Sequence, residues 1–320
     1  MKRNWTAAWS LFVLSPLIAE YLLGSLPMQL ITILPLMAML YGSGAILVRE
    51  CVRRANLGWP ALLLLAAAYG LTEEGLVTQS LFNPNYLHLR LLDYGWMPAL
   101  GTSLVWLIYV VGIHVFWSIS VPIAFTEALF PEARDRAWLP GWGLAIFALL
   151  LVLGAGATGR FTYKQLPFMA SPAQLGGTIA AIVVLVGAAR FFPRRPTGPK
   201  PVPPAGTIFG AALVAGSAFM AVRFLAEGAL HLAWPAAFAG YVAVMAAFLA
   251  FVLGFCRNRR WTAAQRFALA SGGVAAYGWA GFAIDISLHG TASLPAHVGL
   301  VVVFAALTLL AGRRSARATG

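Results

Sequence analysis

Ten apolar segments constrain the fold of this chain more than any other feature, because each is near the roughly 20 residues that a helix needs to cross a bilayer. Of the 320 residues, 60% are hydrophobic and only 10% are charged. A soluble domain carries about 25% charged residues, so the sequence predicts an all-α, polytopic bundle of about ten transmembrane helices. The expected spans are residues 8–25, 28–48, 59–81, 98–129, 138–157, 173–192, 206–226, 235–255, 264–286 and 294–312.

Basic residues gather at every second junction between these segments, whereas the opposite loops carry few. This distribution predicts that both termini are cytoplasmic. It also accounts for the net charge of +12 without a nucleic-acid partner, for which the sequence shows no motif. We expect an integral protein of a prokaryotic-type plasma membrane, such as a bacterial inner membrane, with the lipid bilayer as its partner. The basic residues are Lys2, Arg3, Arg49, Arg53, Arg54, Arg134, Arg136, Arg190, Arg194, Arg195, Lys200, Arg257, Arg259, Arg260, Arg313, Arg314 and Arg317.

A Pro-rich stretch at 191–205 is predicted to be a cytoplasmic linker. It separates residues 1–190, with six helices, from residues 206–320, with four. The first apolar segment is read as a retained helix rather than a cleaved signal peptide. Cys51 and Cys256 adjoin basic clusters and are expected to face the reducing cytoplasm.

Two adjacent carboxylates, Glu73 and Glu74, interrupt the third apolar segment. A carboxylate within a membrane helix costs about 2.5–3.5 kcal/mol on insertion scales and usually serves a function. The fourth segment contains His114, with Ser118 one helical turn later and Pro122 as an expected kink. A glutamate and a histidine could hold and activate a water molecule, the glutamate as general base.

Glu73, Glu74 and His114 are therefore the predicted catalytic residues, with no metal and no cofactor assigned. Neighbouring residues on an α-helix point about 100° apart, so only one of the two carboxylates is expected to face His114.

Acidic residues recur toward the same end of other helices. The seventh and ninth segments share the pattern Phe-x-x-acid-x-x-Leu-His. Its acid and histidine are Glu227 and His231 in the seventh segment, and Asp285 and His289 in the ninth. The structural interpretation is that the side chains of these acids reach the membrane interface. A metal would accept such acid–histidine pairs, but a hydrogen bond at a helix end explains them equally well. As a functional interpretation, the predicted substrate-binding residues are Glu20, Asn83, Ser118, Glu227 and Asp285.

Around these residues the chain resembles the CPBP family of intramembrane glutamate proteases, which includes the type II CAAX prenyl endopeptidases. Glu73 and Glu74 match the paired acids of the family motif Glu-Glu-x-x-x-Arg, and His114 matches the histidine of Phe-x-x-x-His. Thr78 stands where the motif has arginine, and Val110 where it has phenylalanine. The resemblance implies peptide cleavage by a glutamate-activated water, or a non-catalytic relative of such an enzyme.

Two functions from different classes remain open. An intramembrane hydrolase acting on a peptide or small molecule requires Glu73, Glu74 and His114 to converge. A transporter or binding protein for a cation, an amine or a proton-coupled solute requires Glu20, one of the paired glutamates, Glu227 and Asp285 to line one cavity. A scaffold for other membrane proteins is a third alternative, and the sequence predicts no oligomeric state.

Overall fold

The computed structural model describes residues 4–195, 197–258 and 260–317. Within these residues ten helices are long and apolar enough to cross a membrane, which confirms the predicted polytopic bundle. Lys2, Arg3 and Arg259, which contributed to the predicted orientation, lie outside the described residues. The ten spans are Trp5–Leu22, Met28–Arg54, Trp59–Val77, Leu104–Leu129, Gly141–Gln165, Pro172–Ala189, Ala205–Leu225, Trp234–Phe255, Ala263–His289 and Thr291–Arg314.

Several spans combine α-helix with short turns of other helical types. The α-helices are α1 (Trp5–Pro16), α2 (Leu34–Met37), α3 (Ser43–Arg54), α4 (Trp59–Leu71), α5 (Leu104–Ile113), α6 (Val121–Leu129), α7 (Gly141–Gln165), α8 (Pro172–Ala189), α9 (Ala205–Leu225), α10 (Trp234–Phe255), α11 (Ala263–His289) and α12 (Leu294–Arg317). The π-helical turns are η1 (Leu17–Leu22), η3 (Ala38–Gly42), η4 (Thr72–Val77) and η6 (His114–Ser120). The 3-10 turns are η2 (Met28–Ile33), η5 (Tyr86–His88), η7 (Pro131–Ala133) and η8 (Thr291–Ser293), and β1 (Trp96–Met97) pairs antiparallel with β2 (Thr102–Ser103).

The third and fourth spans are shorter than predicted. The third ends at Val77 rather than at residue 81, because a series of turns begins there. The fourth begins at Leu104, since the preceding residues form the β1–β2 hairpin. Pro122 does not divide the fourth span, because it occupies the first turn of α6, where its missing N–H is tolerated.

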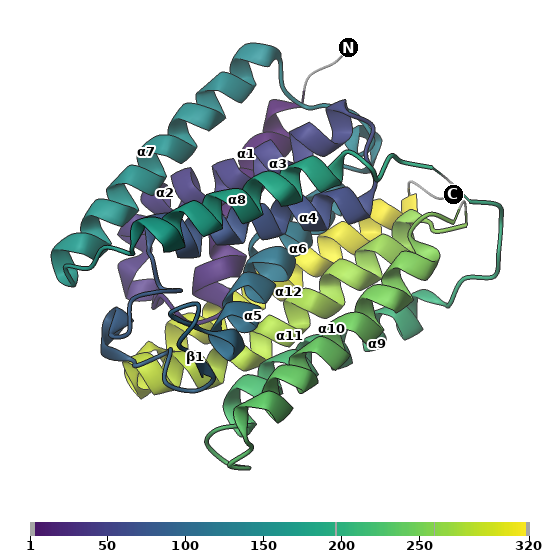
Figure 1. The fold of residues 1–320 in the computed structure, drawn as a ribbon. Helices are drawn as coiled ribbons and strands as arrows, with labels where there is room; N and C mark the ends of the chain where they lie inside the picture. The colour runs from purple at the N-terminus through teal and green to yellow at the C-terminus, as the bar shows by residue number, and fades with distance from the viewer. Residues whose placement is uncertain (1–3, 196, 259, 318–320) are drawn as a thin grey trace.

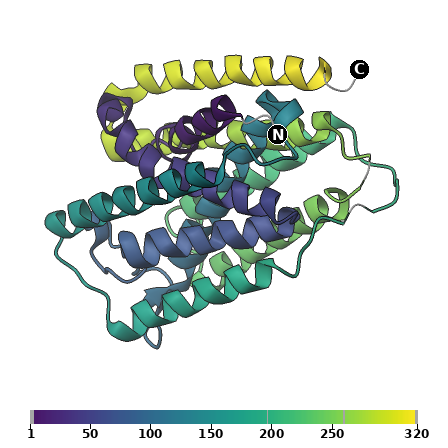
Figure 2. The same cartoon turned by 90° about the horizontal axis from the view of Figure 1, so that it is seen from above.

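The helices lie roughly side by side in one bundle (Figure 1). α1 begins and α12 ends at the same end, which we call the terminal end, and the β1–β2 hairpin lies at the opposite, hairpin end (Figure 1). Figure 2 shows α12 along one edge of the bundle. α11 packs against α9, α12 and α6, whereas α7 and α8 expose large apolar side chains such as Val152 and Val183. Exposed apolar side chains on such helices suit contact with lipid.

Four π-helical turns interrupt the first four spans. Proline explains one of them: Pro122 has no N–H to donate to the carbonyl of Ser118, four residues earlier. That carbonyl instead accepts a hydrogen bond of 2.7 Å from the hydroxyl of Ser15 on α1. The widened turn in the fourth span is therefore stabilised by a neighbouring helix.

Part of the basic cluster after the second span is buried inside the bundle at the terminal end. Arg49 and Glu50 on α3 are fully buried and 2.7 Å apart, and Glu127 on α6 lies 2.7 Å from Arg53. The guanidinium of Arg49 also lies over the ring of Trp138, 3.5 Å from its centroid. These arginines join α3 to α6 and are not free loop charges.

Candidate functional site

The two adjacent glutamates lie on the π-helical turn η4, near the hairpin end of the third span. The N–H of Thr78 donates to the carbonyl of Glu73 at 2.8 Å, a bond across five residues that closes the wide turn. Glu73 is 3% exposed and Glu74 is 8% exposed. Because the wide turn departs from the 100° spacing of an α-helix, both carboxylates point into the bundle. The sequence predicted that only one of them would face His114.

His114 lies between these two carboxylates. Its Nε2 is 2.8 Å from a carboxylate oxygen of Glu74, and its Nδ1 is 3.6 Å from Oε2 of Glu73. The same Nδ1 is 3.1 Å from the hydroxyl of Ser118, one turn later on η6. One imidazole therefore meets two carboxylates and a hydroxyl, and the three predicted catalytic residues converge.

Hydroxyl groups fix the second oxygen of Glu74. Its Oε2 accepts a hydrogen bond of 3.1 Å from the Thr78 hydroxyl and a further one from the Ser80 hydroxyl. Ser80 in turn accepts a hydrogen bond of 3.1 Å from the indole N–H of Trp106 on α5. With His114 on its other oxygen, the carboxylate of Glu74 is held on both sides.

Glu73 is held less completely. Among the described residues its Oε2 has no hydrogen-bond partner, and neither has the hydroxyl of Tyr69, one turn earlier on α4. The Tyr69 ring meets the His114 ring edge to face, with centroids 6.1 Å apart. Leaving a buried polar atom unpaired costs about 1–3 kcal/mol, so such atoms in a folded protein call for a functional explanation.

A third carboxylate joins the group from the first span. Glu20 on η1 is partly buried and accepts hydrogen bonds from the Tyr41 hydroxyl and, at 2.5 Å, from the Ser25 hydroxyl. The Tyr41 ring stacks against the His114 ring, with centroids 5.9 Å apart and planes inclined by 19°. Tyr41 therefore connects Glu20 to the Glu73–Glu74–His114 centre.

Each of the four π-helical turns supplies at least one residue to this group. Glu20 comes from η1, Tyr41 from η3, Glu73 and Glu74 from η4, and His114 from η6. π-helical turns are rare and occur frequently at functional sites. Their convergence marks this part of the membrane domain as the candidate site.

Carboxyl groups outnumber basic groups here. No Lys or Arg nitrogen of the described chain lies within 4.0 Å of Glu20, Glu73 or Glu74; His114 meets Glu73 and Glu74, and Glu20 joins them through Tyr41. Glu73, Glu74 and His114 offer three ligand atoms within 4.8 Å of one another. Two carboxylates and one imidazole form a donor set that suits a divalent cation such as zinc, although the sequence analysis assigned no metal ligands.

A groove of about 380 Å³ approaches the centre between η4 and α7. Thr78 lines the groove and donates to Glu74, so one side chain separates the groove from the centre. Asn83, a predicted substrate-binding residue, also lines it, together with Gly156 and Gly159 of α7. Because these glycines have no side chains, they leave room in the groove on the α7 side.

Two predicted substrate-binding residues lie elsewhere. α9 ends at Leu225, so Glu227 and His231 follow the helix, and both are exposed. Asp285 is buried on α11, which packs against η1, and neither of its carboxylate oxygens has a hydrogen-bond partner among the described residues. Among the described residues neither acid pairs with His114, whose carboxylate partners are Glu73 and Glu74.

Tyr41, Tyr69 and Ser80 were not among the site residues predicted from the sequence. Tyr69 had a local signal, because it lies four residues before Glu73 and shares its helix face. Tyr41 and Ser80 had none: Tyr41 reaches the centre through the packing of η3 against α1, and Ser80 through the turn after the third span.

Comparison with known proteins corrects the resemblance to CPBP proteases. No curated protein and no solved structure matches the chain. The CPBP resemblance is wrong, since the family model that matches is a different one. The motif lacked its arginine at Thr78 and its phenylalanine at Val110, and a pair of adjacent glutamates is too short to identify a family. The matching model covers residues 10–319, and the chain therefore belongs to an uncharacterized membrane protein family.

Proposed function

We propose that this protein is an intramembrane hydrolase in which Glu73, Glu74 and His114 activate a water molecule. The observation that carries the proposal is the unpaired, buried Oε2 of Glu73, which lies 3.6 Å from the Nδ1 of His114. A carboxylate oxygen with no protein donor is free to accept a proton from water, while the neighbouring imidazole is already oriented by Glu74.

The reaction runs by general base catalysis. Glu73 takes a proton from water as the water oxygen bonds to the carbonyl carbon of the substrate. The Tyr69 hydroxyl, which has no partner among the described residues, donates to the oxyanion that forms. The proton on Glu73 passes to the leaving group when the tetrahedral intermediate collapses, and His114 stays fixed between Glu74 and Ser118.

The groove between η4 and α7 is the entrance for the substrate. It lies within the span of α7, a helix that exposes much of its apolar surface, so a substrate embedded in the membrane reaches it sideways. Asn83 and Gln79 line the groove and supply polar groups. We infer a peptide or ester bond close to the membrane interface as the target.

The test is cleavage by the purified protein in nanodiscs, followed by mass spectrometry on a panel of membrane-spanning peptides and ester lipids. Glu73→Gln should abolish any cleavage seen with the native chain, and Glu227→Gln, at an exposed acid, should not change it. Cleavage retained in Glu73→Gln would overturn the proposal. Repeating the assay with a chelator tells whether Glu73, Glu74 and His114 act on water directly or through a bound divalent cation.

A second candidate, cation- or proton-coupled transport, is favoured by one observation. Glu20 joins the centre through its hydrogen bond with Tyr41, so a third carboxyl group lies near the two that contact His114, and such an excess of buried carboxyl groups attracts a cation or protons. In proteoliposomes, uptake of amines or metal ions that is lost in Glu20→Gln, with no cleavage by the native chain, would favour transport over hydrolysis.

A further inference from the structure

A basic pocket of about 460 Å³ lies at the terminal end, between the first six spans and the last four. Its walls come from the start of α4, the loop before α7, residues 191–195 of the linker, and the segment that joins α10 to α11. Six arginines line it: Arg53, Arg134, Arg194, Arg195, Arg257 and Arg266.

The pocket contains more positive than negative charge. Of the residues that the structure describes, two acids line it, Glu127 and Asp135. Glu127 is paired with Arg53 at 2.7 Å, and Asp135 accepts from Arg134 at 2.8 Å and from Arg194 at 2.9 Å.

Three of the pocket arginines, Arg195, Arg257 and Arg266, have no carboxylate within 4.0 Å among the described residues. Arg257 and Arg266 donate instead to backbone carbonyls, at 2.9 and 2.7 Å. Guanidinium groups held in this way retain free N–H donors, which suit the oxygens of a phosphate.

The pKa of the Asp135 carboxyl reflects the positive charge of these arginines. Burial raises the pKa of this carboxyl, but the hydrogen bond and charge of Arg134 and the charges of Arg194 and Arg266 lower it to about 2. The charges of Arg134, Arg194 and Arg266 therefore act together at this wall of the pocket.

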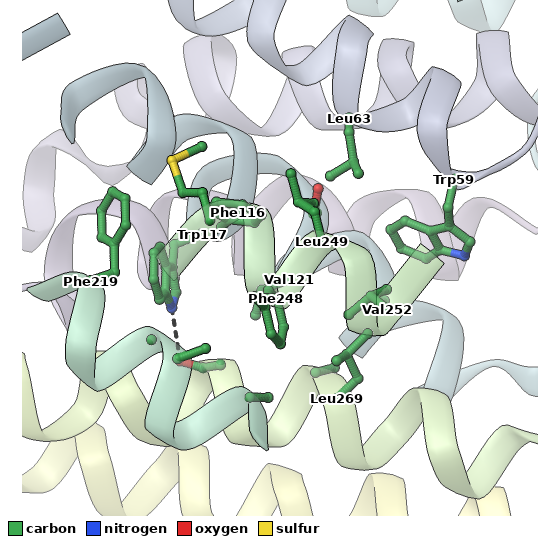
Figure 3. A pocket seen from close by; sticks show the side chains of 18 of the residues that line it. Trp59, Leu63, Phe116, Trp117, Val121, Phe219, Phe248, Leu249, Val252 and Leu269 are labelled. Carbon is green, nitrogen blue, oxygen red and sulfur yellow. Dashed lines mark hydrogen bonds between the residues drawn. The ribbon is translucent and has the colours of Figure 1, made fainter. Parts of the chain in front are cut away.

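An apolar cavity adjoins the basic pocket. Trp59 lines both, and Figure 3 shows it at one end of the apolar cavity, with Phe219 at the other. Phe116, Phe248 and Leu249 line the cavity between them, and nearly all of its surface is apolar. A small gap lined by Trp59 and Arg266 lies against the same helices. A charged compartment and an apolar one thus lie on either side of a shared tryptophan.

We propose that these adjoining cavities bind one anionic phospholipid, with its phosphate among Arg195, Arg257 and Arg266 and an acyl chain in the apolar cavity. Tryptophan at the boundary suits the level of a lipid headgroup. Basic pockets between membrane helices on the cytoplasmic side are known to bind such headgroups, and the sequence predicts that the terminal end is cytoplasmic. A soluble phosphate would use the arginines but leave the apolar cavity unexplained.

Backbone hydrogen bonds hold the walls of the pocket together. The N–H of Gly58 donates to the carbonyl of Phe192 at 2.9 Å, the N–H of Arg194 to the carbonyl of Asn56 at 2.8 Å, and the N–H of Thr197 to the carbonyl of Arg257 at 2.7 Å. The linker is therefore fastened to both halves of the bundle. A lipid bound here connects the two halves and stabilises their packing.

Native mass spectrometry of the full chain in detergent tests the proposal with three probes: dioleoylphosphatidylglycerol, dioleoylphosphatidylcholine and inorganic phosphate. We expect one phosphatidylglycerol to bind at least about tenfold more tightly than phosphatidylcholine, which has the same chains. Arg257→Gln and Arg266→Gln should each weaken phosphatidylglycerol binding by about tenfold, because each removes a charge-assisted hydrogen bond. Arg90→Gln, at an exposed arginine of the hairpin end, is the matched control and should bind as the native chain does.

Ala215→Phe places a ring in the apolar cavity and leaves every arginine in place. It should weaken the binding of phosphatidylglycerol without changing that of phosphate. Equal binding of the two lipids would overturn the proposal, as would phosphate binding that matches the lipid in affinity and is unaffected by Ala215→Phe. Elution of each variant as a monodisperse peak shows that a loss of binding is not a loss of folding.

Discussion

Two buried groups of charged residues lie in the same membrane domain but differ in charge balance. At the terminal end, Arg49, Arg53 and Arg54 surround two carboxylates, and each carboxylate has an arginine within 3.3 Å. Glu50 also accepts the backbone N–H of Trp138 at 2.8 Å. Each of these five charged side chains has a partner of opposite charge.

Toward the hairpin end, the balance is reversed. Glu73 and Glu74 share one histidine, Glu20 lies beside them through Tyr41, and a buried oxygen of Glu73 has no hydrogen-bond partner among the described residues. Burying a charge without a partner costs more than burying a paired one. The terminal group thus joins helices, and the less completely paired centre near the hairpin end is where the proposed chemistry would come at some cost in stability.

The largest expected effect comes from breaking the paired group. Arg49→Met leaves Glu50 and Glu127 short of a partner inside the bundle, which should lower the free energy of unfolding by about 3–5 kcal/mol. The measurement is equilibrium unfolding in mixed micelles with increasing SDS. Arg90→Met, at an exposed ion pair, should change stability by less than about 1 kcal/mol. Equal effects of the two substitutions would contradict the comparison.

The opposite pattern is expected at the unpaired centre. Glu73→Gln removes an excess buried charge, so the free energy of unfolding should stay the same or rise by about 1 kcal/mol. Turnover should nevertheless fall by about 100-fold or more, because the general base is lost. Unfolding in mixed micelles and cleavage in nanodiscs measure the two quantities. A large loss of stability would mean that the centre holds the fold together, as the arginine group does.

A smaller effect tests how the backbone around His114 is held. Ser15→Ala removes the donor to the Ser118 carbonyl and should cost about 1–2 kcal/mol of unfolding free energy. In a Pro122→Ala background that carbonyl regains a backbone N–H as a donor, so the cost of Ser15→Ala should be smaller. The double-mutant cycle is measured by unfolding in mixed micelles, and strict additivity would show that the two sites are independent.

The smallest effect concerns pH. The folded pKa of Asp135 is about 2, below its ordinary value of 3.8: burial raises it, but the Arg134 hydrogen bond and charge outweigh burial. Its contribution to stability is therefore complete above about pH 4 and is lost as the pH falls toward 2. Asp135 is partly exposed, so we expect roughly 1 kcal/mol or less. Thermal unfolding of Asp135→Asn should depend less steeply on pH than that of the native chain between pH 4 and 2.

The sequence determined the membrane class and most of the helices. Nine of the ten predicted spans begin within three residues of those in the structure, because a hydrocarbon layer sets the length and composition of every helix that crosses it. The exception is the fourth, which begins six residues later because the β1–β2 hairpin precedes it. The cost of burying charge in a membrane was also enough to identify Glu73, Glu74 and His114 as candidates from their positions in the sequence.

Only the tertiary structure decided how these residues meet. Regular helical spacing allowed one glutamate to face His114, and the π-helical turns brought both. The tertiary structure also brought Tyr41 and Glu20 to the centre, to which no local sequence pattern connected them. The π-helical turn around Ser118 is stabilised by a hydrogen bond from Ser15 on another helix, and a linear pattern of residues carries no record of such a contact.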